Sequence, residues 1–111
     1  KLGIVTGSGK STVDLLFSVG VEGLFDAIVN GEDISERKPD PEGLLKCLQI
    51  LNVEPDDALY VGDTAIDVQA STAAGICSVA VLSGAGDANS LAEAGAYRII
   101  SDHSALIGLL E

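Results

Sequence analysis

Two aspartates in one short segment have the types and spacing of a metal site. Asp63 follows Gly62 directly after an apolar run, and Asp67 comes four residues later. Four residues are about one helical turn, so both carboxylates can face one point. A few oxygen ligands supplemented by water suit Mg²⁺ better than a transition metal. The structural alternative is that Asp63 or Thr64 caps a helix and that Asp67 is a charge in its first turn.

A second segment has the composition of an anion site. Thr6 ends an apolar run, and Gly7 and Ser8 follow it. The Thr6 hydroxyl and the next two amides would point at an anion, because a helix N-terminus offers free N–H groups and a positive dipole end. The sequence argues against a nucleotide-binding P-loop, since Ile4 stands where that motif needs its first glycine. A glycine-rich helix start with a solvated Lys10 remains the alternative.

A lysine in a proline-rich turn is the third candidate. Lys38 directly precedes Pro39, and a residue before proline is held extended, which fixes the direction of its side chain. Asp40 and Pro41 then predict a helix with Asp40 as its cap and Pro41 at its first position. From this segment alone, Lys38 is either a directed cation or a solvated lysine.

The elements that must position these residues alternate between apolar runs and helical patterns. Strands are expected at residues 2–6, 27–30, 58–61, 78–82 and 97–100. Helices are expected after Ser8, from Pro41, from Thr64 to Gly75, over 90–94 and after Asp102. The predicted inward faces are Leu44, Cys47, Leu48 and Leu51 in the second helix and Ile66, Ala70, Ala73 and Ala74 in the third.

This alternation predicts the α/β fold class, an open, doubly wound parallel sheet in a single domain over residues 1–111. The strands are continuous apolar runs, which is typical of a sheet covered by helices on both faces. Ligands of such sheets bind beyond the carboxyl ends of the strands. Those ends carry Thr6-Gly7-Ser8, Asn30-Gly31, Gly62-Asp63-Thr64 and Ser83-Gly84. A polar site for phosphate or metal is therefore predicted at this edge.

Composition excludes several classes of protein. Hydrophobic residues make up 47% of the chain, which argues against intrinsic disorder. The net charge of −11 repels nucleic acid and anionic lipid, so neither is an expected partner. Two cysteines, Cys47 and Cys77, form no disulfide framework, which favours a cytoplasmic setting. Because the sequence has no Met and starts on a strand, we expect it to be truncated at its N-terminus.

Together, three segments resemble the haloacid dehalogenase-like superfamily, and more narrowly its phosphoglycolate phosphatase-like branch. Residues 4–8 are similar to the family's second motif, a hydrophobic strand ending in Thr or Ser. Residues 38–42 are similar to its third motif, Lys-Pro-x-Pro, and residues 61–67 to its fourth, Gly-Asp-x-x-x-Asp. The resemblance implies a Rossmann-like core and a Mg²⁺-dependent hydrolase of phosphoric monoesters that acts on a small phosphorylated metabolite.

The resemblance also implies roles for individual residues. Phosphate would be bound by Thr6, Gly7, Ser8 and Lys38. Thr6 and Lys38 would act in catalysis by holding the phosphoryl group and neutralising charge. Asp63 and Asp67 form the implied metal site: Asp63 would bind Mg²⁺ directly, and Asp67 would support Lys38 or a metal-bound water.

The sequence departs from the family pattern in one large respect. The family's first motif, Asp-x-Asp-x-Thr, supplies the nucleophile, and no Asp-x-Asp occurs in these residues. The substrate-selecting cap of this branch is also missing. We therefore expect that the chain carries only part of an active site and is inactive alone. We also expect an open seam in the sheet, which is the gap left where the strand of the missing first motif would lie. The seam would be closed by pairing residues 2–6 with 58–61, by self-association, or by the missing N-terminal segment.

Some functional alternatives stay open at this point. Phosphatases, phosphomutases and dehalogenases of the superfamily differ mainly in the missing part, so the sequence does not identify the substrate. A non-catalytic receiver-like or interaction domain is the alternative function. Receiver domains place their acids first, then Thr, then Lys, whereas the order here is Thr6, Lys38, Asp63.

Overall fold

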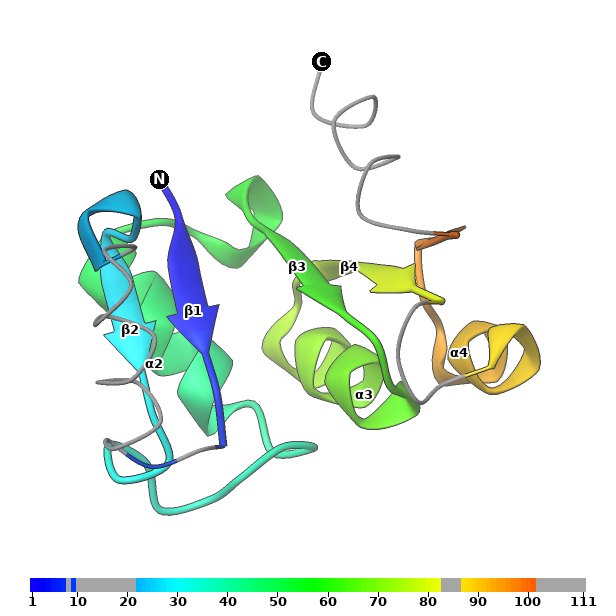
Figure 1. Ribbon diagram of the computed structural model, residues 1–111, viewed down its shortest axis with the longest axis horizontal. Helices are drawn as coiled ribbons and strands as arrows, with labels where there is room; N and C mark the ends of the chain where they lie inside the picture. The colour runs from blue at the N-terminus through cyan, green and yellow to red at the C-terminus, as the bar shows by residue number, and fades with distance from the viewer. Residues whose placement is uncertain (8, 10–21, 83–86, 102–111) are drawn as a thin grey trace.

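The computed structural model describes residues 1–7, 9, 22–82 and 87–101 (Figure 1). Its strands are β1 (Gly3–Val5), β2 (Ala27–Val29), β3 (Leu59–Gly62), β4 (Cys77–Val81) and β5 (Arg98–Ile100). Its helices are α2 (Glu42–Leu51), α3 (Ala65–Ala74) and α4 (Ala88–Ala94), with short 3-10 turns η1 (Glu22–Leu24) and η2 (Pro55–Asp57). The helices expected after Ser8 and Asp102, and the loop at Gly84, lie outside the described residues.

Parallel strands alternating with helices confirm the predicted fold class. β1 pairs with β2 in parallel, with Gly3 opposite Ala27 and Val5 opposite Val29. β4 is the central strand of a second sheet and pairs in parallel with β3 and β5. Each described strand lies within two residues of a predicted one.

The described strands form one sheet of two strands and one of three, so the seam expected between residues 2–6 and 58–61 is open. β1 hydrogen-bonds only to β2, and β3 only to β4 (Figure 1). The direct pairing of residues 2–6 with 58–61 is therefore not formed. The two sheets are joined instead through side chains, since Val5 and Tyr60 pack against the same core cluster.

Helix packing explains how that cluster forms. Leu44 and Leu48 of α2 meet Ala70 and Ala74 of α3 in a buried cluster that also includes Ile76. A separate cluster places Cys47 of α2 against β2. Helix α4 packs on α3 and the second sheet through Leu91. Both sheets are thus held against the α2–α3 pair, and the carboxyl ends of their strands remain near these helices.

The buried face of α3 differs from the predicted one. Ala70 and Ala74 are buried as expected, but Ile66 is 48% exposed and Ala73 is also exposed. The other buried residues of α3 are Asp67, Val68 and Ser71. The buried stripe is therefore rotated relative to the predicted one, and it includes a carboxylate that requires a partner.

Local signals set the helix ends. Thr64 is the N-cap of α3, and its hydroxyl accepts from the Asp67 amide. Gly75 ends the same helix in the left-handed conformation at φ 77°, as the sequence predicts. Helix α2 starts one residue later than predicted, with Pro41 in the N-cap position. Asp40 therefore lies one residue before the N-cap, where its carboxylate accepts from the Glu42 amide at 2.9 Å, so its predicted place as the N-cap is wrong by one residue.

No helix in the described ranges is long and apolar enough to cross a bilayer.

Candidate active site

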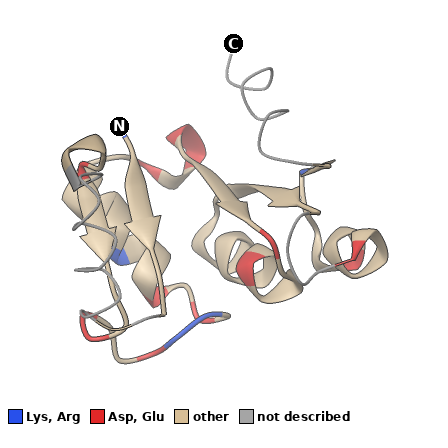
Figure 2. Ribbon diagram, in the orientation of Figure 1, with Lys and Arg blue, Asp and Glu red and all other residues tan. Residues whose placement is uncertain are grey.

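An ion pair joins the predicted cation to the second predicted carboxylate. Lys38 Nζ donates to Asp67 Oδ1 at 2.7 Å, and the two side chains are 23% and 9% exposed. Lys38 comes from the loop between β2 and α2, whose blue, basic stretch extends toward the side of α3 in Figure 2. Asp67 comes from the first turn of α3. The pair therefore holds the Lys38 loop against the carboxyl end of β3.

Both oxygens of the Asp67 carboxylate are engaged. Oδ2 accepts from the backbone amides of Asp63 and Thr64, at 3.1 and 3.2 Å, and from the Thr64 hydroxyl at 3.1 Å. Oδ1 accepts from Lys38 and, at 3.3 Å, from the Tyr60 hydroxyl. The capping interpretation of Asp67 is thus confirmed, and the same carboxylate also positions Lys38.

Gly62 is the residue that allows this arrangement. A Cβ atom built on Gly62 would lie 2.4 Å from Asp67 Cβ and 2.8 Å from Asp67 Oδ2. Contacts that short do not occur between real side chains, so only glycine lets the Asp67 side chain lie against the end of β3. The glycine of the Gly-Asp-x-x-x-Asp segment is therefore required by close packing, because its backbone is outside the left-handed region.

The pair is electrostatically matched. Burial lowers the pKa of Lys38, but the hydrogen bonds and charges of Asp67 and Tyr60 outweigh it, so this pKa lies above its usual value. Burial raises the pKa of Asp67, but Lys38 and the hydrogen bonds from Asp63 and Thr64 bring it below its usual value. Both groups are therefore charged at neutral pH, and the cation is retained where an anionic substrate is expected.

Asp63 lies beside this pair with its carboxylate unengaged. It directly follows β3, is half-buried, and has no hydrogen-bond or ion-pair partner for its side chain among the described residues. The same residues contain no group of three or more His, Cys, Asp or Glu side chains that could hold a metal. One or two protein carboxylates with waters and substrate phosphate are the usual Mg²⁺ environment, so Asp63 fits one ligand of such a site.

The predicted phosphate segment lies at the end of β1. The Thr6 amide donates to the Val29 carbonyl at 2.9 Å, which extends the β1–β2 ladder by one bond. Gly7 follows, and a Cβ there would lie 4.0 Å from Nη1 of Arg37. Ser8 lies outside the described residues. The structure thus places a second cation, Arg37, close to the segment predicted to bind phosphate.

Sequence reasoning missed Tyr60 and Arg37. Lys38 Nζ donates to the Tyr60 hydroxyl at 3.2 Å, which closes a triangle of Lys38, Tyr60 and Asp67. A tyrosine inside an apolar strand was the available signal, since the hydroxyl of a tyrosine that packs against a core usually has a partner. Arg37 gave no signal beyond its position next to Lys38.

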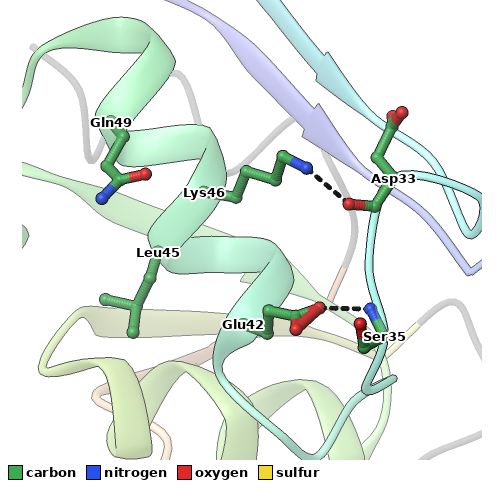
Figure 3. Close-up of a pocket in the computed structure, with 6 residues that line it drawn as sticks. All are labelled: Asp33, Ser35, Glu42, Leu45, Lys46 and Gln49. Carbon is green, nitrogen blue, oxygen red and sulfur yellow. Dashed lines mark hydrogen bonds between the residues drawn. The ribbon is translucent and has the colours of Figure 1, made fainter.

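A cavity of about 430 Å³ on the outer face of α2 is separate from this site (Figure 3). It is lined by Asp33, Ser35, Glu42, Leu45, Lys46 and Gln49. Lys46 Nζ donates to the Asp33 carbonyl, and Glu42 accepts from the Ser35 amide, both at 2.5 Å. Its polar groups thus bind one another, and none of the predicted site residues lines it.

Comparison with known proteins identifies the family. A sequence model of haloacid dehalogenase-like hydrolases matches residues 1–81. The chain belongs to this family. It is 39% identical over 88 residues to a phosphoglycolate phosphatase of Chromobacterium violaceum, covering 79% of this chain and 40% of that protein. It is 38% identical over 82 residues to the pyrophosphatase PpaX of Bacillus thuringiensis, covering 73% and 38%.

Solved structures agree with this family assignment. The crystal structure of a hydrolase from Pseudomonas syringae superposes with a TM-score of 0.89 at 30% identity, covering 99% of this chain and 53% of that chain. The chain therefore spans about half the length of that structure and less than half the length of the curated relatives. The predicted resemblance and its Rossmann-like core are confirmed.

Proposed function

We propose that this chain supplies part of the active site of a Mg²⁺-dependent, cytoplasmic hydrolase of phosphoric monoesters that acts on a small phosphorylated metabolite. The observation that carries the proposal is the Lys38–Asp67 pair at the carboxyl end of β3, next to Asp63, whose carboxylate has no partner among the described residues. Relatives named phosphoglycolate phosphatase and pyrophosphatase support phosphoryl transfer as the reaction class.

The chemistry needed from these residues is positioning and charge neutralisation. Phosphoryl transfer spreads negative charge over the equatorial oxygens, so fixed cations and N–H donors lower its barrier. Lys38 would donate to a phosphoryl oxygen, while Thr6 and the amides of Gly7 and Ser8 would hold the others. Asp63 would bind Mg²⁺, which neutralises phosphate charge when present. Asp67 keeps the Lys38 ammonium in place.

We further propose that the nucleophile comes from outside these 111 residues, because the sequence contains no Asp-x-Asp. The sheet organisation supports this proposal. Among the described strands, β1 pairs with β2 and β3 with β4, and β1 does not pair with β3 although both pack on one core cluster. A strand between them would satisfy their unpaired N–H and C=O groups, and each such group left buried costs about 1–3 kcal/mol. An additional segment would thus complete both the sheet and the site.

Phosphate release from phosphoglycolate, from pyrophosphate and from a generic aryl phosphate, with millimolar Mg²⁺, tests this function. We expect no turnover by the 111-residue chain alone. Turnover should arise after a segment with Asp-x-Asp-x-Thr on an apolar strand is added in trans, and the melting temperature should rise. Asp63→Asn should abolish that turnover, whereas Asp57→Asn, on an exposed 3-10 turn, should not.

Two results would contradict the proposal. Turnover by the chain alone that Asp63→Asn removes would show that the nucleophile lies within these residues. A mixture whose melting temperature rises without turnover of phosphoglycolate, of pyrophosphate or of a generic aryl phosphate would contradict hydrolysis of phosphoric monoesters as the function.

A further inference from the structure

The hydroxyl of Tyr60 has no role in the proposed function, although it contacts both members of the Lys38–Asp67 pair. It lies 3.2 Å from Lys38 Nζ and 3.3 Å from Asp67 Oδ1. Tyr60 belongs to β3, whereas Lys38 lies on the loop before α2 and Asp67 on α3. The hydroxyl accepts from the ammonium and donates to the carboxylate, so it ties three separate elements together.

The geometry of the ammonium shows why a second tether matters. A lysine ammonium has three N–H donors on a flexible stem, and one ion pair leaves it free to rotate about that contact. Among the described residues, Asp67 and Tyr60 are the partners of Lys38 Nζ. Two acceptors fix the direction of the third N–H.

We infer that Tyr60 is a positioning residue, which holds the Lys38 ammonium so that its remaining N–H faces an incoming phosphoryl oxygen. The identity of that anion rests on the proposed function, but the tether itself does not. The ring has a second role, because it packs partly buried against the α2–α3 core cluster. The positioning role belongs to the hydroxyl alone, so Tyr60→Phe separates the two.

The chain offers a matched control. Tyr97 is the other tyrosine of the sequence, it is 67% exposed, and it lies between α4 and β5 away from Lys38. Tyr60→Phe and Tyr97→Phe each remove one hydroxyl and keep one ring. Both are compared with the native chain at a temperature where circular dichroism shows each of them folded.

The first measurement is the ¹H–¹⁵N NMR signal of the Lys38 side-chain ammonium. A tethered ammonium exchanges its protons with water more slowly than a free one. We expect Tyr60→Phe to accelerate this exchange several-fold and Tyr97→Phe to leave it unchanged. An exchange rate in Tyr60→Phe equal to that of Tyr97→Phe would overturn the inference, whatever the affinity for anions.

The second measurement is the affinity for inorganic phosphate with Mg²⁺ present. One tethering hydrogen bond corresponds to a loss of about 3- to 10-fold in affinity for Tyr60→Phe. In a Lys38→Met background, Tyr60→Phe should have no further effect, because Tyr60 acts through Lys38. An equal loss in that background would overturn the positioning role. Absence of phosphate binding by the native chain, with the NMR difference present, would instead contradict the proposed function and leave the tether supported.

Discussion

Replacing Gly62 with alanine tests whether the site depends on the close contact between β3 and α3. The new Cβ would lie 2.4 Å from Asp67 Cβ and 2.7 Å from Asp67 Cγ. Carbon atoms in contact normally lie about 3.5–4.0 Å apart, so a separation of more than about 1 Å must be gained. A change of rotamer cannot relieve the shorter contact, because a Cβ atom is fixed to the backbone. The first turn of α3 must therefore move away from β3.

The magnitude follows from what that movement disturbs. Overpacking a tight site by a methyl group typically costs about 1–3 kcal/mol. The movement also weakens the cap formed by Thr64 and Asp67, and a lost cap costs about 1 kcal/mol. Weakening of the Lys38–Asp67 ion pair adds to this. We expect a loss of about 2–5 kcal/mol in the free energy of unfolding, a large part of the roughly 5–15 kcal/mol of a typical domain.

Urea denaturation at pH near 7, together with the Lys38 ammonium signal, measures this effect. The matched control is Gly23→Ala, since a Cβ on Gly23 meets no atom within 4 Å. That control should change the free energy of unfolding by no more than about 0.5–1 kcal/mol. If Gly62→Ala were as stable as Gly23→Ala and kept the ammonium signal, the packing explanation for this glycine would be refuted.

Three further predictions concern charge, anion binding and the core. The pKa of Asp67 is lowered and that of Lys38 raised on folding. The charged Asp67 carboxylate therefore stabilises the fold at pH values above the usual pKa of an aspartate, and this stabilisation is lost on acidification. The charged Lys38 ammonium stabilises the fold at pH values below the usual pKa of a lysine, and this stabilisation is lost in strong base. The difference in unfolding free energy between the native chain and Asp67→Asn should be constant between about pH 5 and pH 9 and should shrink below about pH 4. A difference that grows on acidification would contradict the lowered pKa of Asp67. Arg37→Gln should weaken phosphate binding by calorimetry about 2- to 5-fold, the scale of an exposed charge contact, while Lys46→Gln should not; equal effects would remove Arg37 from the site. Leu44→Ala, at a side chain that is 2% exposed, should destabilise the chain by about 2–5 kcal/mol in urea denaturation, and a loss below about 1 kcal/mol would show that the α2–α3 cluster is not the core.

The sequence predicted most of the local structure because its signals are local. Apolar runs, the Asp40-Pro41 pair and Gly75 located the strands and helix ends to within one or two residues. The fixed spacing of Asp63 and Asp67 predicted a site at the carboxyl end of β3. These features depend on residues only a few positions apart in the chain.

What the sequence did not predict depends on contacts between distant segments. The predicted buried face of α3 was wrong. Ile66 and Val68 are both apolar, and only the packing of the helix against the rest of the chain decides that Val68 is buried and Ile66 exposed. The support of Lys38 by Asp67 was implied only by the resemblance, because the two residues lie 29 positions apart in the chain. The sequence analysis expected an open seam but left its closure undecided, because which strands pair is not encoded by periodicity alone.

The most direct measurement of the central claim is an NMR titration of the 111-residue chain with inorganic phosphate in millimolar Mg²⁺. The amides of Thr6 and Gly7 and those from Gly62 to Asp67 should shift first, together with the Lys38 ammonium. Asp63→Asn should remove the Mg²⁺ dependence of these shifts. Shifts confined to the cavity beside Lys46, or unchanged by Asp63→Asn, would contradict a phosphate and Mg²⁺ site at this edge.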